Sequence, residues 1–390
     1  MFDIEYSGTL IFADKIRRLS SAGKEIVNFT SGTLIDTPKI IKEKTKQAID
    51  DGLGASLTDS SGMFELKEAI AKFINSKENI YVDPNREIIV TIGAKNAIFI
   101  ALQVIINLGD EILIPDPFWP SYKPLVILAG GVPKYFQMGK CNGKFSIEED
   151  NILEAINPKT KMIILNTPHN PTGRVLKKRE IELICKIAKE KDLFVLSDES
   201  YRQAIYDDNK HYSIASFPGM KERTIFVYSF SKSYTMYGWR IGFAFANKDL
   251  ISKMTIIQSN TVSCPTSFCQ KGALAAVTDG EEHILKSLDR YTKIRNMLVE
   301  GLNSIAGISC EIPEGGFWVF PNVSKIDKNT DRLANYLLKH HGVGVTPGSI
   351  FGINGLGHVR IWYLHEEEYI LKGFEKLKKG LNEYRKVNTQ

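Results

Sequence analysis

The chain has 390 residues, with 50 Lys plus Arg and 45 Asp plus Glu, which gives a net charge of +5. This length exceeds the usual size of one hydrophobic core, so two domains are expected. The charge excess is small and scattered along the chain, which argues against a nucleic-acid partner.

The chain starts MFDIEY, with no basic segment followed by an apolar core, so no secretory signal is expected and a cytoplasmic protein is predicted. The longest strongly apolar stretch, 97–106, is about half of a bilayer span, so no membrane partner is expected. The five cysteines form no Cys-x-x-Cys pair, as expected of thiols in a reducing compartment. No metal-ligand spacing joins them to the seven histidines, so no metal site is predicted.

Short runs rich in β-branched residues alternate with helical patterns from about residue 87 to 245. The runs are 87–90, 111–114, 162–165, 193–196 and 224–227. Continuous apolar strands between helices predict a mostly parallel sheet covered on both faces, the three-layer α/β/α arrangement. Such sheets bind ligands at the carboxyl ends of their strands, so residues directly after each run are the site candidates.

Amphipathic helices are predicted around and after these strands. Their apolar faces carry Leu66, Ile70, Phe73 and Ile74 in one helix, Ile181, Leu183, Ile184 and Ile187 in a second, Ile284, Leu288, Tyr291 and Leu298 in a long third, and Ile370, Phe374, Leu377 and Leu381 in the last. The change of texture beyond about residue 280 predicts a smaller α+β domain. We expect a large domain of residues 41–284, and a small domain of residues 1–40 and 285–390.

The first candidate site residues follow the strand at 87–90, where Gly93, Ala94 and Lys95 open an apolar helix. A glycine at a helix start exposes backbone N–H groups with the positive end of the helix dipole behind them, which suits a phosphate. Taken alone, the same residues are more often an ordinary turn before a helix.

The strand at 162–165 is followed by the run 166–173, NTPHNPTG. Two prolines bracket Asn170 and stiffen the loop, so its amide can donate to a phenolate oxygen at little entropic cost. A simple turn is the alternative, and His169 is interpreted as a hydrogen-bonding loop residue rather than a base.

Asp198 and Tyr201 come after the strand at 193–196. A carboxylate here can pair with a protonated ring nitrogen, and the tyrosine can donate to a ring oxygen. A helix N-cap accounts for the aspartate alone.

Lys232 follows the strand at 224–227 in the string SFSK, with Arg240 eight residues further on. Burial and a neighbouring cation both favour a partly neutral amine, which carbonyl chemistry requires. A solvated loop would also explain so short a string, but the order of all these residues across successive strands favours a cofactor site.

Taken together, these motifs resemble the class I/II aminotransferases that depend on pyridoxal 5′-phosphate, in the group of aspartate and kynurenine aminotransferases, over nearly the whole chain. The resemblance implies the transferase fold type I, a homodimer, and Lys232 as the Schiff-base lysine and proton carrier. It implies that Asp198 binds the pyridine nitrogen, that Tyr201 and Asn170 bind the phenolic oxygen, that Arg240, Ser229 and the Gly93, Ala94 and Lys95 turn hold the phosphate, and that Trp119 stacks on the ring. The substrate α-carboxylate would be held by Arg360, Gly32 and Asn170.

The resemblance breaks at two places near the substrate. Leu57 stands where relatives usually carry a tyrosine that reaches the phosphate of the neighbouring subunit, so Thr58 or Ser60 is a possible replacement. The segment after Gly32, residues 33–36, lacks the usual acidic turn with proline. Lys95 either meets a distal substrate carboxylate or assists the phosphate, and we prefer the second.

The resulting hypothesis is an aminotransferase that moves an α-amino group from an amino acid to a 2-oxo acid by a ping-pong mechanism. The alternative is a lyase, cyclase or oxidase that uses the same cofactor on an amino acid. A transcription regulator with this fold is disfavoured, because the fold begins almost at the first residue. His358 and the glycines at 352, 355 and 357 are not assigned a role.

Overall fold

The computed structural model describes residues 8–32, 35–141 and 143–388. The strands are β1 (Val27–Asn28), β2 (Ile88–Thr91), β3 (Glu111–Asp116), β4 (Val132–Gln137), β5 (Gly139–Cys141), β6 (Lys144–Ser146), β7 (Thr160–Asn166), β8 (Phe194–Asp198), β9 (Thr224–Ser229), β10 (Gly242–Phe245), β11 (Trp318–Val319), β12 (Val343–Gly344), β13 (Thr346–Pro347) and β14 (Val359–Trp362). The α-helices are α1 (Gly8–Ser21), α2 (Lys39–Asp50), α3 (Phe64–Glu78), α4 (Ala94–Ile105), α5 (Tyr122–Leu128), α6 (Glu149–Ala155), α7 (Lys178–Glu190), α8 (Phe230–Ser233), α9 (Lys248–Thr261), α10 (Ser267–Asp279), α11 (Glu281–Asn303), α12 (Thr330–Tyr336) and α13 (Glu367–Asn388). Short η segments lie between them.

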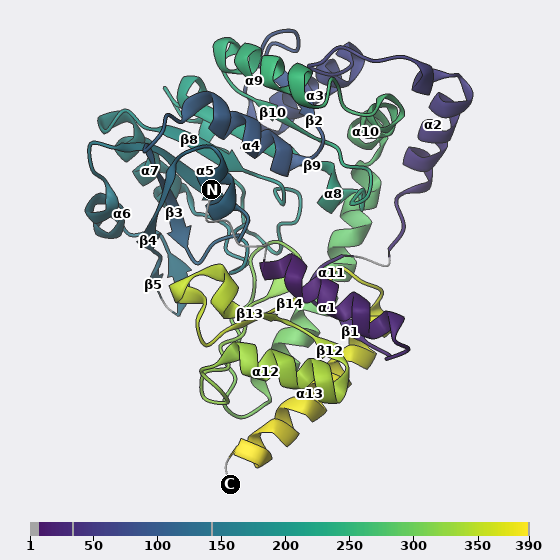
Figure 1. Cartoon of the computed structure of the whole chain (residues 1–390), viewed down its shortest axis with the longest axis vertical. Coiled ribbons are helices and arrows are strands. Elements are labelled where there is room, and N and C mark those ends of the chain that lie inside the picture. The colour runs from purple at the N-terminus through teal and green to yellow at the C-terminus, as the bar shows by residue number, and fades with distance from the viewer. Residues whose placement is uncertain (1–7, 33–34, 142, 389–390) are drawn as a thin grey trace.

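The large sheet has, among the described residues, seven strands in the order β2-β10-β9-β8-β7-β3-β4. All neighbouring pairs are parallel except those of β10, which runs antiparallel to β2 and β9. Every residue of β2, β3, β9 and β10 is buried, as continuous apolar runs covered on both faces require. The prediction of a mostly parallel sheet covered by helices is therefore confirmed (Figure 1).

Two strands of this sheet were not predicted from the sequence. β4 lies at the edge and exposes most of its residues, so it lacks the apolar run that marks an inner strand. β10 is a central strand, but it is short and begins at a glycine, directly after the GWRI string. The helix α8 that separates β9 from β10 has only four residues, so the alternation of strands and amphipathic helices does not reveal this antiparallel insertion.

The predicted helices form with the expected buried faces. Leu66, Ile70 and Ile74 are buried on α3, while Phe73 is only partly buried. The apolar stretch at 97–106 belongs to α4, which packs against the sheet. None of the helices within the described residues is long and apolar enough to cross a membrane.

In the lower part of Figure 1, α1 and β1 gather with the C-terminal elements β12, α12 and α13. β1 pairs in parallel with β12, so residue 27 lies beside residue 343. A separate antiparallel sheet has the order β11-β14-β13. One hydrophobic core there combines Phe12, Val27 and Phe29 with apolar residues from 291 to 384. The division into domains of 41–284, and of 1–40 with 285–390, stays a prediction, since this core also includes Tyr201, Ala204 and Tyr206 from 41–284.

Three adjacent parallel strands end at the same edge of the large sheet. β7 ends at Asn166, β8 at Asp198 and β9 at Ser229, and the register pairs Asn166 with Asp198. Because neighbouring parallel strands present their carboxyl ends together, the polar residues that follow them converge on one place. That place faces the segment that carries β14 and the N-terminal segment.

Candidate active site

A cavity of about 150 Å³ opens where the strand ends converge. It is lined by Ala94, Lys95, Trp119, Asn166, Asn170, Asp198, Ser200, Tyr201, Ser229, Ser231, Lys232, Tyr237 and Arg240. Nine of these were candidates from the sequence, and they come from positions up to 146 residues apart, 94 to 240. The fold therefore brings separate motifs into one site.

Lys232 lies on the short helix α8, whose N-cap is Ser229. Its Nζ atom is 4.3 Å from the ring centre of Tyr237 and 4.7 Å from that of Trp362. The pKa of Lys232 is lowered to about 7, mainly by burial and in addition by the nearby cations Arg360 and Arg240. A substantial share of this amine is neutral at neutral pH, so it can act as a nucleophile and as a base.

Asp198 is buried at the end of β8 and is held by hydroxyl groups. The Tyr122 hydroxyl donates to Oδ2 at 2.8 Å, and the Ser200 hydroxyl donates to Oδ1 at 2.6 Å. Burial raises the pKa of Asp198, and both hydrogen bonds oppose that rise. The side chain of Asn166 donates to the Asp198 carbonyl at 2.9 Å, which ties the ends of β7 and β8 together. The carboxylate is thus fixed and faces the cavity.

One end of the cavity is suited to an anion. Gly93 precedes α4 with φ +92°, and a Cβ atom there would lie 2.7 Å from Nη2 of Arg240. The positive φ favours glycine at this position, and the absence of a side chain leaves room for the guanidinium. Burial lowers the pKa of Lys95, and Arg240 contributes to the shift. Ser229 and Ser231 add hydroxyl groups at the same end of the site, so helix N-terminus, guanidinium and hydroxyls converge.

Arg360 lies on β14 and reaches the cavity from the other side. Its Nη1 donates to Oδ1 of Asn170 at 2.9 Å, and its Nη2 donates to the carbonyl of Thr30 at 2.6 Å. Its Nε is buried and has no hydrogen-bond partner among the described residues. Burial lowers the pKa of Arg360 to about 10, so the group stays cationic at neutral pH. A buried cation with an unused donor is suited to a carboxylate ligand.

Two aromatic residues and one glycine complete the predicted set. Trp119 is partly buried, edge-on to Tyr122 with ring centres 5.2 Å apart, and Lys95 Nζ lies 5.2 Å from its ring. Tyr201 is buried with its ring against Trp318. Gly32 adopts φ +90° and its carbonyl accepts from Trp362 Nε1 at 2.7 Å. Gly32, Gly93 and Arg360 lie beside the lining residues rather than among them.

The two departures from the family pattern have different positions. Leu57 is 78% exposed, on the surface of the chain. Thr58 accepts from Gln270 at 2.9 Å, and neither Thr58 nor Ser60 lines the cavity. Of the segment after Gly32, Thr33 and Leu34 lie outside the described residues.

The two histidines that were weak candidates lie away from the reacting side of the site. Nδ1 of His169 is 2.9 Å from the Thr172 hydroxyl, and burial lowers the pKa of His169 to about 3. His358 stacks on Phe320 with ring centres 4.8 Å apart. Neither lines the cavity.

Sequence reasoning missed five lining or supporting residues, namely Tyr122, Asn166, Ser200, Ser231 and Tyr237. Asn166 is the last residue of β7, Ser200 is two residues after Asp198, and Ser231 stands in the string SFSK. The rule that ligands bind at strand ends could have found these three residues. Tyr122 lies outside the strand ends and reaches Asp198 only through the fold. The hydroxyl of Tyr237 is buried without a partner among the described residues, inside the same site.

The chain is similar to known proteins over nearly its whole length. The family model "Aminotransferase class I and II" matches residues 24–377. An aspartate aminotransferase of Pyrococcus abyssi is 39% identical over 382 residues, covering 96% of this chain and 97% of that protein. An aromatic-amino-acid aminotransferase 2 of Thermococcus litoralis is 37% identical over 354 residues, 90% of each.

Among solved structures, the aspartate aminotransferase from Thermus thermophilus with maleate superposes with a TM-score of 0.91 at 32% identity. It covers 97% of both chains. The expectation of fold type I, drawn from the resemblance, is confirmed by this likeness.

Proposed function

The chain belongs to the class I and II aminotransferases, which transfer amino groups between amino acids and 2-oxo acids with pyridoxal 5′-phosphate, and on this premise we propose that Lys232 carries the cofactor. The observation that supports this role most strongly is the amine itself, which lies in the cavity beside Arg360 and Arg240 with a pKa lowered to about 7. A neutral amine can form a covalent bond to an aldehyde carbon at neutral pH, whereas a protonated one cannot.

The donor set of the cavity fits the cofactor. A carboxylate, an amide, a phenol and an anion site are needed for its ring nitrogen, ring oxygen and phosphate, and the cavity provides each kind of group. The cofactor supplies an electron-withdrawing ring that stabilises negative charge at the substrate α-carbon. The unpartnered buried Nε of Arg360 and hydroxyl of Tyr237 are further donors left for a ligand.

We assign the cofactor-binding roles residue by residue. Asp198, held by Tyr122 and Ser200, keeps a negative charge for a protonated ring nitrogen. Asn170 uses Oδ1 to accept from Arg360, which leaves its Nδ2 to donate to the ring oxygen beside Tyr201. The anion end is assigned to the phosphate, with Gly93, Ala94, Lys95, Ser229 and Arg240 as its ligands, and Trp119 is assigned to the ring face.

The substrate is held from the β14 side in this proposal. Arg360 binds the α-carboxylate, and the backbone at Gly32 closes over it. Lys232 then accepts the α-proton and later donates it at another atom. An amine with a pKa near neutrality can both accept and donate a proton at neutral pH. A first amino acid leaves as a 2-oxo acid, and a second 2-oxo acid takes up the amino group in the reverse sequence.

A half-reaction tests this function. The cofactor-loaded protein is incubated with single amino acids and no acceptor, and the released 2-oxo acid is measured. Transamination predicts one equivalent of oxo acid per site and no further turnover until a 2-oxo acid is added. Continued release of product without an acceptor would instead identify a lyase or an oxidase.

We propose that the enzyme is a homodimer, with the Leu57 region in the interface. Leu57 is 78% exposed and Phe64 is 49% exposed, and Ile256 on the adjacent helix α9 is 60% exposed. α9 lies against this segment, since the side chain of Gln258 donates to the carbonyl of Ser60 at 2.5 Å and to that of Val90 at 2.8 Å. Light scattering of wild type and of Leu57→Glu would test the proposal, because a monomeric wild type contradicts it.

A cytoplasmic location is the last part of the proposal. All five cysteines are free thiols, one of them exposed, as suits a reducing compartment. Fractionation of the source cells, with the protein followed by antibody, would test the location.

A further inference from the structure

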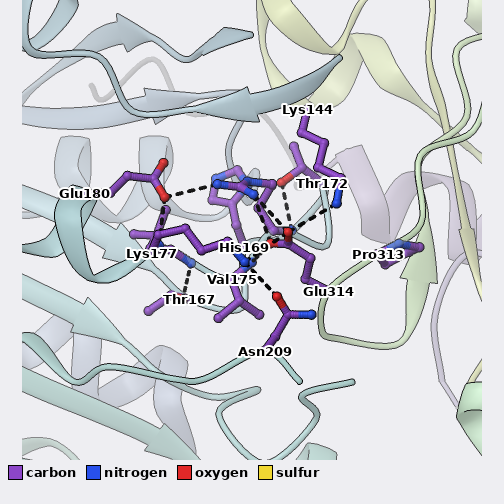
Figure 2. Close-up of polar contacts among 12 residues, drawn as sticks. Lys144, Thr167, His169, Thr172, Val175, Lys177, Glu180, Asn209, Pro313 and Glu314 are labelled. Carbon is purple, nitrogen blue, oxygen red and sulfur yellow. Dashed lines mark hydrogen bonds and ion pairs between the residues drawn. The ribbon is translucent and has the colours of Figure 1, made fainter. Parts of the chain in front are cut away.

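A buried charged network, shown in Figure 2, lies close in the chain to Asn170 but outside the residues that line the cofactor cavity. Its centre is Arg174, which is placed between two carboxylates. Nη1 of Arg174 lies 3.0 Å from both oxygens of Glu314, and Nη2 lies 3.0 Å from Oε2 of Glu180. All three side chains are at most 10% exposed. The cost of burying the cation is thus offset by two opposite charges.

Glu314 belongs to the segment between α11 and β11, so it reaches Arg174 from another part of the chain. Its carboxylate also accepts from the backbone N–H of Val175 at 3.0 Å, and Lys177 and Lys144 lie 3.1 and 3.3 Å away. In Figure 2 these contacts converge on the Glu314 carboxylate. The Glu314 carboxylate therefore contacts Arg174, the Val175 N–H and Lys177, all of which directly follow the loop that carries Asn170.

The main chain reinforces this docking. The N–H groups of Glu314 and Gly315 both donate to the Gly173 carbonyl, at 2.8 and 2.9 Å. Gly173 adopts φ +72°, and a Cβ atom there would lie 2.6 Å from Cβ of Pro313. The two segments are in such close contact that a displacement of residues 313–316 would also displace Gly173.

The loop itself transmits position from Arg174 to Asn170. The His169 N–H donates to the Arg174 carbonyl at 2.7 Å, and the Gly173 N–H donates to the His169 carbonyl at 2.8 Å. The Asn170 N–H donates to Oδ1 of Asn166 at 2.8 Å. Residues 169–174 are thus a turn closed between His169 and Arg174, and Asn170 is its second residue.

We propose that Glu314 is a positioning residue for this enzyme. Through Arg174 it holds the closed turn, so that Asn170 presents Nδ2 to the cofactor ring oxygen and Oδ1 to Arg360. The inference rests on the proposed role of Asn170. It links a residue outside the cavity to both cofactor and substrate binding.

The expected signature is spectroscopic. A donor to the ring oxygen favours the anionic form of that oxygen, so a poorly placed Asn170 raises the pH midpoint of the visible absorbance of the cofactor-loaded protein. Glu314→Gln keeps the size of the side chain and an acceptor for Val175, but removes the charge that Arg174 requires. We expect the midpoint to rise by about 0.5 pH unit, and KM for the amino donor to rise about fivefold with a smaller change in kcat.

Glu311→Gln is the matched control. It removes the same charge three residues earlier in the same segment, from an exposed side chain. The proposal predicts a wild-type midpoint and a wild-type KM for this variant. If Glu311→Gln and Glu314→Gln shift the midpoint equally, the effect is one of overall charge, and the proposal is overturned.

A double variant separates positioning from a purely structural role. If Glu314 acts through Asn170, then Glu314→Gln adds nothing to the midpoint shift of Asn170→Ala. A full additional shift in the double variant would overturn the proposal. If Glu314→Gln fails to fold, Glu314→Asp, which keeps the charge, replaces it in the same comparison with Asn170→Ala and the double variant. Failure of the proposed function would be visible separately, because wild-type protein would then release no oxo acid.

Discussion

Arg360 is expected to keep the amine of Lys232 partly neutral, in addition to any role in substrate binding. With a pKa of about 7 in place of the ordinary 10.5, about half of the amine is neutral at pH 7, against about three molecules in ten thousand for an ordinary lysine. Arg360 is the largest charged contributor to this lowering, after burial. Replacing it with glutamine removes a neighbouring cation, so the pKa of Lys232 rises. The first unit of that rise lowers the neutral fraction at pH 7 about fivefold, and each further unit lowers it about tenfold.

Competitive acetylation of the cofactor-free protein measures this directly. Trace acetic anhydride is added between pH 5 and 9, and the labelling of the peptide that contains Lys232 is followed by mass spectrometry. We expect a midpoint near pH 7 in wild type and a higher midpoint in Arg360→Gln. Arg332→Gln is the control, because Arg332 lies on α12 with its side chain 63% exposed and paired with Asp327. A midpoint that is the same in wild type and Arg360→Gln would refute the reasoning.

Other variants test the support of the site and of the core. Tyr122→Phe removes a 2.8 Å donor to Asp198, so the pKa of that carboxyl rises further and cofactor affinity, measured by fluorescence titration, should fall about tenfold at the acidic end of the pH range and less at the alkaline end. An affinity loss that is independent of pH would argue against a charge effect. Ile163→Ala on β7 removes a fully buried side chain and should lower the free energy of unfolding by about 2–5 kcal/mol in urea, while Leu108→Ala, at a 92% exposed position, should change it by less than about 0.5 kcal/mol.

The inner strands and the residues that follow them could be predicted from the sequence, since both depend on local patterns. Apolar runs mark β7, β8 and β9, and parallel pairing places Asp198 and Lys232 at one edge of the sheet. The strand β10 could not be predicted, because its place between β2 and β9 depends on tertiary pairing rather than on an alternation with helices.

Contacts between distant segments were also beyond prediction from the sequence. Tyr122 reaches Asp198 across 76 positions, and Glu314 reaches Arg174 across 140. Neither pair has a spacing that local periodicity can detect. A sequence can indicate that a buried carboxylate and a buried cation each need a partner of opposite charge, but it does not show which distant residue that partner is.

The most direct test of the account is to identify the amine that carries the cofactor. Borohydride treatment of the loaded protein fixes pyridoxal 5′-phosphate to that amine, and peptide mapping locates it. We expect a modified peptide that contains Lys232 in wild type, and neither fixed cofactor nor multiple turnover at the native rate in Lys232→Ala. Fixation at another lysine, such as Lys95, in the wild-type protein would contradict it.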